Sequence, residues 1–418
     1  MKKNIIISIE TFILLFFSFL FSGCLKDNCS HANRYTWLEP LYRTSAEVRA
    51  NIKSNQPQKI ENPGKIFIRG NYIFLNEINK GIHVIDNSRP SAPVNIAFIN
   101  IPGNVDIAVK GNTLYADLYT DLVTLDISDP ANVVKKNILD GVFPAVFFGG
   151  MFLRGDSGKI VYDWVRHDTT VYENCDASGW NYPGVAYLAD ASQAGNKSAA
   201  GIGGSTSRFA LLNNYLYTVG ENNLNAFNIS NSNQPSFTNS VQVDWHVETI
   251  YPFQNKLFVG SNNGMFIYDV QSNPSLPSKI GEFTHARACD PVIADDKYAY
   301  ITLHSGTECL GFNNQLDVVQ LNNFTDASLV KTYNLTSPRG LSKDGNLLFI
   351  CDGTDGVKVY NAADASNLKL ITQIPGAETY DVIAYNKVAI VVSTDGLYQY
   401  DYSDVKNIHL ISKISILK

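Results

Sequence analysis

The sequence has few of the residues from which reactive centres and cross-linked scaffolds are built. Its 418 residues include 6 cysteines, 3 methionines and 7 histidines, and charged residues make up 17%. No two cysteines form a Cys-x-x-Cys pair, which argues against a zinc ribbon or a thioredoxin-type redox centre. Motifs for a Ser-His-Asp hydrolase or a metalloprotease are also missing. The net charge of −6 gives no electrostatic footprint for nucleic acid.

The first residues indicate export. "MKKNIIISIETFILLFFSFLFSGC" (residues 1–24) has two lysines, an apolar stretch broken by Glu10, and small residues before Cys24. This is the order of a secretory signal peptide rather than of a membrane span. "FSGC" resembles the lipobox of bacterial lipoproteins, in which the cysteine is lipidated, although Phe21 replaces the usual leucine. We therefore expect residues 1–23 to be a signal peptide and Cys24 to be lipidated; an ordinary signal peptide with a chance cysteine is the alternative.

The residues after Cys24 bear on the location of the protein. "LKDN" (residues 25–28) loosely resembles the tether that sends lipoproteins to the cell surface in some Gram-negative bacteria. We expect a lipid anchor in the bacterial outer membrane, with periplasmic or outward orientation left open. Residues 24–61 are expected to form a tether or stalk that partly packs on the main domain, with a short helix at "SAEVRANI" (residues 45–52). Loss of the leader changes the net charge from −6 to −7.

A repeat fills the rest of the chain. A polar turn residue precedes an apolar run eight times, with spacings of 41, 38, 64, 41, 41, 50 and 40 residues. These landmarks are Asn71, Asn112, Gly150, Asn214, Asn255, Asp296, Asn346 and Asn386. Each unit contains about four short strands rich in Val, Ile, Leu and Tyr, joined by turns of Asn, Asp and Gly. Four strands in about 40 residues is the size of one β-propeller blade.

The repeat predicts an all-β fold, a β-propeller over residues 62–418. Eight landmarks predict eight four-stranded blades, including a third unit at "FFGGMFLRGDSGKIVYDW" (residues 147–164). Seven blades with a side hairpin formed by this third unit is the alternative. Residues 167–206 are rich in small residues and are expected to be a loop insertion that crosses a face of the propeller.

"GIHVIDNSRP" (residues 81–90), "DLVTLDISDP" (residues 121–130) and "GMFIYDVQSNP" (residues 264–274) resemble the LVIVD-repeat family of bacterial and archaeal surface proteins. The resemblance covers roughly residues 62–418 and is strongest over 62–141 and 200–282. Later units depart from the pattern: Asn361 stands where Asp is usual, and "GLYQYDYSDV" (residues 396–405) lacks the proline. The resemblance implies a β-propeller at the cell surface and no established reaction.

An aspartate ends the third strand of several units, at Asp86, Asp126, Asp269 and Asp401. Its recurrence argues for a structural role, because equivalent catalytic sites on every blade would serve no purpose. We expect these side chains to accept backbone N–H bonds at the strand exit.

We expect functional residues at positions that are equivalent in every repeat unit but carry a different residue type in each. The first strand of a propeller blade is innermost, so residues near its start line the mouth of the central channel. The second strand ends on the same face, and ten residues at these positions or beside them are ligand-binding candidates: Asp106, Arg208, His246, Glu248, His285, Arg287, Asp290, Arg339, Asp352 and Asp381. Arginines could hold a carboxylate or phosphate, and the acids a hard cation or sugar hydroxyls. The alternative is that the charges pair with one another and plug the channel.

The expected function is a non-enzymatic envelope lipoprotein that binds a protein or glycan through one loop face and the channel mouth. Aromatic residues including Trp180, Tyr182 and Trp245 could contribute stacking surface. A hydrolase or lyase acting on an extracellular polymer, or a scaffold subunit of an envelope complex, are the alternatives. No catalytic residue and no cofactor is predicted, and a structural or ligand-bridging divalent cation is kept open.

Five cysteines remain after Cys24, so at least one is unpaired in the monomer. Cys289 starts the inner strand of the sixth unit, and Cys309 lies in that unit's extended connection between its second and third strands. Both map to the same face, and an exported protein meets oxidising conditions. We predict a disulfide between them, with Cys175 as a competing partner.

Overall fold

The computed structural model describes residues 30–143, 147–148, 151–152, 159–174, 202–220, 222–285, 291–305 and 313–416. The chain divides into two compact units, Met1–Leu41 with Asp163–Ala189, and Tyr42–Tyr162 with Asp190–Lys418. Strands β1 (Ser30–Thr44) and β13 (Lys159–Asn174) pair in a two-stranded sheet, and most of their residues belong to the smaller unit. Within it, the Trp37 ring stacks on His167 with ring centroids 4.2 Å apart.

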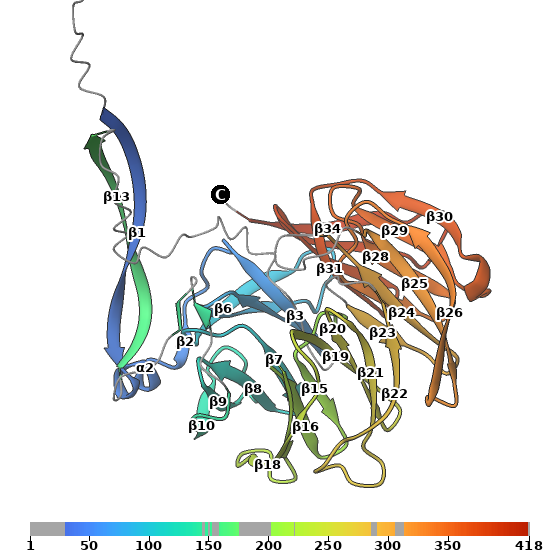
Figure 1. Cartoon of the computed structure of the whole chain (residues 1–418), viewed down its shortest axis with the longest axis horizontal. Coiled ribbons are helices and arrows are strands. Elements are labelled where there is room, and N and C mark those ends of the chain that lie inside the picture. Colours follow the sequence, from blue (N-terminus) through green and yellow to red (C-terminus); the bar gives the residue numbers. More distant parts are fainter. Residues whose placement is uncertain are drawn as a thin grey trace, which may run out of the picture. The chain divides into compact units, whose positions relative to one another are not determined.

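The described part of the larger unit is a β-propeller of seven blades, each built from four strands that follow one another in the sequence (Figure 1). Blade 1 consists of β3 (Pro63–Arg69), β4 (Tyr72–Glu77), β5 (Gly81–Asp86) and β6 (Val94–Asn100). Blade 2 consists of β7 (Ile107–Lys110), β8 (Thr113–Leu118), β9 (Asp121–Asp126) and β10 (Val134–Leu139). Blade 3 consists of β15 (Phe209–Leu212), β16 (Tyr215–Val219), β17 (Asn223–Asn228) and β18 (Ser236–Gln242). Blade 4 consists of β19 (Val247–Phe253), β20 (Lys256–Ser261), β21 (Gly264–Asp269) and β22 (Ser278–Thr284). Blade 5 consists of β23 (Val292–Ala294), β24 (Tyr298–Leu303), β25 (Gln315–Asn322) and β26 (Asp326–Asn334). Blades 6 and 7 consist of β27 (Leu341–Asp344), β28 (Leu347–Cys351), β29 (Val357–Asn361) and β30 (Lys369–Ile374), with a 3₁₀ turn at Ala365–Asn367; and β31 (Thr379–Tyr385), β32 (Val388–Ser393), β33 (Gly396–Asp401) and β34 (His409–Ser415).

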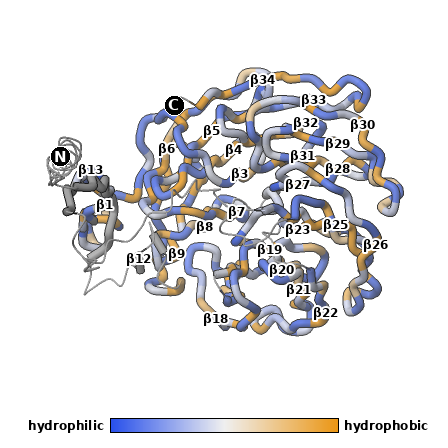
Figure 2. The backbone as a smooth tube through the Cα atoms, turned by 45° about the horizontal axis from the view of Figure 1, so that its top comes forward, coloured by the Kyte–Doolittle hydropathy of each residue, from blue (hydrophilic) through white to orange (hydrophobic). Residues whose placement is uncertain are grey.

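The blades close into a ring by side-chain packing. The first strand of each blade lies nearest the centre and the fourth lies on the rim (Figure 2). A separate cluster of buried apolar side chains fills each of the seven interfaces between neighbouring blades. The cluster that joins blade 7 to blade 1 contains Ile66 and Ile73 of one and Ile383 and Val392 of the other. Each blade therefore keeps its own four strands, and no terminal strand is exchanged among the described blades.

The expectation of eight blades is wrong, and the alternative of seven is correct. The third repeat unit forms the short hairpin of β11 (Phe147–Phe148) and β12 (Met151–Phe152), and its following segment belongs to β13, which pairs with β1. A blade needs four strands that cover both of its neighbours. This unit supplies a two-stranded hairpin, while blades 2 and 3 pack directly on each other through a shared apolar cluster.

The recurrent aspartates have the structural role expected of them. Asp86, Asp126 and Asp401 each accept the backbone N–H of the serine two residues later, at 2.9, 2.9 and 2.7 Å. Asp269 accepts the N–H of Ser272 at 3.3 Å. The hydrogen bonds from the Ser128 hydroxyl and N–H lower the pKa of Asp126 to about 2. These carboxylates fix the turn from the third to the fourth strand.

Every outer strand carries a β-bulge at the same place. In each of the seven described blades, the ladder between the third and fourth strands skips one residue of the fourth. The skipped residues are Ile96, Lys136, Thr238, Ile280, Val330, Ile371 and Ile411. A bulge bends an edge strand away from the flat geometry that a foreign strand could extend.

A short N-terminal segment packs on blades 1 and 2. The helix expected near residue 45 is present as α2 (Ser45–Ala50), started by a capping box between Thr44 and Glu47. Arg49 of this helix forms an ion pair with Asp121 of blade 2. The following strand β2 (Lys53–Asn55) adds a fifth strand to the outer edge of blade 1. None of the helices formed by the described residues is long and apolar enough to cross a membrane.

Candidate functional site

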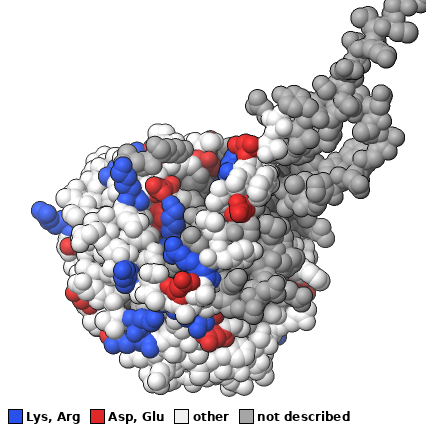
Figure 3. Space-filling view, turned by 90° about the vertical axis from the view of Figure 1, so that its left-hand side faces the viewer, with Lys and Arg blue, Asp and Glu red and all other residues white. Residues whose placement is uncertain are grey.

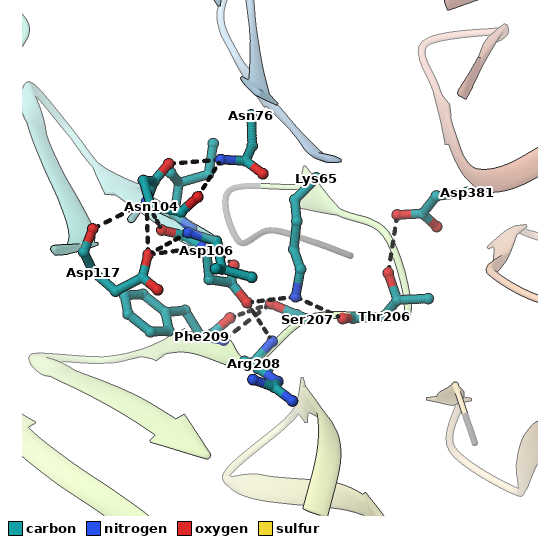
Figure 4. A network of polar contacts seen from close by, with 12 residues as sticks. Lys65, Asn76, Asn104, Asp106, Asp117, Thr206, Ser207, Arg208, Phe209 and Asp381 are labelled. Atoms are coloured by element: carbon teal, nitrogen blue, oxygen red, sulfur yellow. Dashed lines mark hydrogen bonds and ion pairs between the residues drawn. The ribbon is translucent and has the colours of Figure 1, made fainter. Parts of the chain in front are cut away.

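The centre of the propeller is crossed by the chain itself. We call residues 202–208 the channel segment and the face on which the first strands begin the mouth face. Strand β14 (Ile202–Gly203) of this segment pairs with β3 on its inner side, which places it in the central channel. The segment then continues into blade 3. Its backbone and small side chains form hydrogen bonds with residues of blades 1, 2, 6 and 7, and Figure 4 shows several of these contacts.

Lys65 and Asp106 form a buried ion pair beside the channel segment. Lys65 Nζ donates to Asp106 Oδ2 at 2.8 Å and to the Thr206 carbonyl at 3.3 Å. The side chains are 0% and 2% exposed. Asp106 also accepts the N–H groups of Arg208, at 2.7 Å, and Ile107, at 2.8 Å. Burial lowers the pKa of Lys65 and raises the pKa of Asp106, while the charge of each partner opposes the shift in the other.

A layer of amide and carboxyl groups supports this pair from blades 1 and 2. Asp117 accepts the backbone N–H groups of Val105 and Asp106, both at 2.8 Å, and the Asn104 amide at 2.6 Å. Asn76 donates to Asn104 Oδ1 at 2.7 Å. Burial raises the pKa of Asp117 to about 6, although these donors favour its charged form. The layer fixes the backbone from which the Asp106 carboxylate projects.

On the other side of the channel segment, Asp381 of blade 7 lies fully buried. It accepts the Thr206 hydroxyl at 3.3 Å and the N–H of Val382 at 3.0 Å. Two glycines make room for its carboxylate: a Cβ added to Gly204 would lie 1.9 Å from Asp381 Oδ2, and one added to Gly340 would lie 2.2 Å from Oδ1. The close approach of the chain on both sides explains why these two positions carry no side chain.

Arg339 and Asp352 form a second polar group on blade 6. Arg339 donates to Glu378 at 2.9 Å and lies over the ring of Tyr380, 5.1 Å from its centroid. Asp352 is fully buried and accepts the N–H groups of two residues in the turn before β27, Thr336 and Ser337, together with Lys358. Arg208 directly precedes β15 and Arg339 lies two residues before β27, so both arginines lie on the mouth face, at the inner strands of blades 3 and 6. The buried Nε of each has no hydrogen-bond partner among the described residues.

The remaining candidates lie around blade 4. His246 is exposed at the loop before β19, with a positive φ of 51°, and Glu248 follows within that strand. His285 comes directly after β22, and its N–H donates to the Asn263 carbonyl at 3.3 Å. Arg287 and Asp290 lie outside the described residues, as do Cys24, Cys289 and Cys309 and the competing Cys175. The described residues contain no group of three or more His, Cys, Asp or Glu side chains that could hold a metal ion.

The structure thus joins Asp106, Arg208 and Asp381 in one network and places Arg339 and Asp352 in another. Ser205 and Thr206 were missed as site residues, because small polar residues after an insertion are typical of a loop. Ser205 accepts the N–H of Leu341 at 2.8 Å. Lys65 could have been paired with Asp106 beforehand, since both stand six residues before their turn landmarks, Asn71 and Asn112.

A pocket of about 540 Å³ opens on the face opposite the mouth, between blades 2 and 3. Most of the residues that line it are polar, among them Lys110, Asn112 and Asn214. Lys110 Nζ donates to Asn214 Oδ1 at 2.8 Å across it. The pocket contains none of the candidate residues.

The fold and the self-filled channel define the class of protein, a seven-bladed β-propeller. The model of the LVIVD repeat matches residues 63–98, 103–140, 203–243 and 255–285. Each of these four stretches falls on one blade, from blade 1 to blade 4, so the repeat in the sequence corresponds to the blade in the structure. The chain therefore contains LVIVD repeats in these four stretches. No curated protein matches the sequence.

Solved structures share the architecture at low sequence identity. The periplasmic gluconolactonase PpgL of Pseudomonas aeruginosa is 11% identical, with a TM-score of 0.52 over 87% of this chain and 96% of that one. A protein from Lactobacillus plantarum is 12% identical, with a TM-score of 0.54 over 85% and 97%. A Bacteroides fragilis protein provisionally assigned as a 6-phosphogluconolactonase is 9% identical, with a TM-score of 0.53 over 88% and 96%. At these identities the likeness is one of fold.

Proposed function

We propose that this protein is a lipid-anchored β-propeller of the bacterial envelope that binds a protein or glycan partner on its mouth face and catalyses no reaction. One observation carries the proposal: the centre of the channel is occupied by the protein's own residues 202–208. The carboxylates of Asp106 and Asp381 are engaged with Lys65 and Thr206. A buried carboxylate that is already bonded to groups of the protein itself is poorly placed to act on a substrate.

With the channel centre filled, the loops of the mouth face become the surface on which a partner would bind. Loops held by a rigid scaffold are the usual place for recognition. On the side of the molecule shown in Figure 3, basic and acidic side chains lie interspersed, so no field of one sign covers that side. The sequence of residues 1–24, with its signal peptide and lipobox, supports attachment at Cys24 to the outer membrane.

Binding to isolated envelope fragments tests this function. A Cys24→Ser variant, which lacks the lipidation site, would be sedimented with envelope fragments from the same bacterium at increasing concentration. We expect saturable co-sedimentation that excess unlabelled protein abolishes. Binding that fails to saturate, or none at all, would overturn the proposal. Release of new reducing ends from envelope polysaccharide would instead support the hydrolase or lyase alternative.

A further inference from the structure

The loop between blades 3 and 4 presents one aromatic ring to solvent on the mouth face. Trp245 is 71% exposed, more than any other large apolar side chain among the described residues. Tryptophan is enriched at binding interfaces, because its large ring offers an apolar face for stacking and an N–H group for hydrogen bonding. The loop belongs to the mouth face, where the proposed function places binding.

The loop is held rigid by its own hydrogen bonds. The Trp245 N–H donates to Asp244 Oδ1 at 2.8 Å, and the Asn263 amide donates to Asp244 Oδ2 at 3.3 Å. The N–H of Asn262 donates to the His246 carbonyl at 3.2 Å. His246 itself has a φ of 51°, a conformation that a non-glycine residue adopts at a cost. The hydrogen bonds on both sides of Trp245 hold the loop in this conformation.

A second observation points to a ligand at this corner. Asn262, in the turn between β20 and β21, is 5% exposed, and its amide oxygen has no hydrogen-bond partner among the described residues. A buried acceptor left unpaired costs free energy and calls for a donor. Its backbone contact with His246 places Asn262 next to the loop that carries Trp245.

The surroundings of the ring decide the class of ligand. The neighbours of Trp245 in sequence and in space are polar: Asp244, His246 and Asn263. The loops of the mouth face join one blade to the next, or the second strand of a blade to its third. Trp245 is the one exposed large apolar residue in the described parts of these loops. A protein partner would need a wider apolar centre. A sugar has an apolar C–H face for one ring and hydroxyls for the polar groups around it.

We propose that Trp245, with Asp244, His246, Asn262 and Asn263, forms a binding site for a neutral saccharide. The C–H face of the sugar stacks on the indole, and its hydroxyl groups donate to the Asp244 and Asn262 side-chain oxygens and accept from the Asn263 amide. The carboxylate of Asp244, next to the ring in the sequence, disfavours an acidic sugar such as a uronate. This inference rests on the proposed function and names the glycan, rather than the protein, as the partner.

Native gels cast with a polysaccharide test the site, because a neutral polymer retards only proteins that bind it. The probes are an α-glucan, a β-glucan, a galactomannan and an arabinoxylan, with polygalacturonate as the acidic comparison. We expect at least one neutral polymer to retard the Cys24→Ser protein, and Trp245→Ala to weaken that affinity at least about tenfold. Trp37→Ala, which removes an exposed tryptophan of the smaller unit, is the matched control and should bind unchanged.

Three results would overturn the inference: no retardation by any neutral polymer, equal loss in Trp245→Ala and Trp37→Ala, or unchanged binding by Trp245→Ala. A melting curve for each variant excludes misfolding as the cause of a loss. The envelope assay separates this failure from that of the proposed function. Envelope binding that survives periodate but is destroyed by protease would retain a binding function while rejecting a glycan partner.

Discussion

Replacing Asp106 with asparagine should lower the free energy of unfolding by about 3–5 kcal/mol at pH 7, because removal of one partner strands a buried charge. Lys65 would then face a neutral amide and the Thr206 carbonyl at 3.3 Å, with its own side chain 0% exposed. The loss of unfolding free energy has an upper limit, because the protein can also fold with an uncharged Lys65 side chain. Lysine ordinarily titrates near pH 10.5, so giving up its proton at pH 7 costs about 5 kcal/mol.

The pH dependence of this loss identifies its cause. In the native protein the Lys65–Asp106 pair holds one proton, whichever partner carries it, and the unfolded chain at pH 7 also holds one. In Asp106→Asn, burial lowers the pKa of Lys65 with no partner carboxylate to oppose the shift, so the folded state releases this proton at a lower pH than the unfolded chain does. Stability should therefore rise with pH, by up to about 1.4 kcal/mol per pH unit, until the unfolded lysine titrates. Lys65→Met should show the opposite slope, because burial raises the pKa of Asp106 and the folded state then holds the extra proton.

Urea unfolding followed by tryptophan fluorescence at pH 7, 8 and 9 measures both effects. This range lies above the pKa of about 6 that burial gives Asp117, so that group adds no slope of its own. The double variant Lys65→Met with Asp106→Leu serves as the control and should have no such slope relative to the native protein. A loss below about 1 kcal/mol with no pH dependence would refute the buried pair, since a solvated lysine behaves in that way.

Three further outcomes follow from the structure and the sequence. Gly204→Ala should lower stability by about 1–3 kcal/mol in thermal or urea unfolding, because its Cβ would overlap a buried carboxylate, whereas Gly376→Ala has open space and should change it little. A destabilised Gly376→Ala would show that glycine loss alone is the cause. Cys24→Ser should move the protein from the membrane fraction to the soluble fraction, and retention in the detergent phase would point to another anchor. Mass spectrometry of unreduced peptides should find Cys289 linked to Cys309, a loop contributing roughly 3 kcal/mol; free thiols at both positions would reject the bond.

The repeat frame predicts most of the fold because hairpins are encoded locally. Turn residues such as Asn112 and Asn255 lie between first and second strands as their spacing indicates. The landmark at Gly150 also marks a hairpin, of β11 and β12. Local periodicity cannot say which sheet a hairpin joins, and here the following strand pairs with β1, more than 100 residues earlier in the chain. The blade count failed at that step.

The sequence predicts where the site residues lie but not which groups they contact. Counting from the landmarks places Asp106 and Arg208 at the start of inner strands, as observed. What these residues contact depends on the channel segment, whose small residues have no strand or helix periodicity. The segment fits because Gly204 lets the backbone pass close to Asp381. This fit depends on the space that the assembled blades leave in the channel, and a local sequence pattern carries no information about that space.

The channel segment also has a consequence for the order in which the molecule can be assembled. Its partners come from distant parts of the chain: Ser205 bonds Leu341, 136 residues later, and Thr206 bonds Asp381, 175 residues later. Contacts of such sequence separation form slowly, because long loops must close first. During synthesis, blades 1 and 2 can form early, but Thr206 finds its partner only after blade 7 has emerged. The last blade to be made therefore completes the middle of the protein as well as its rim, and a chain that stops before it would lack both.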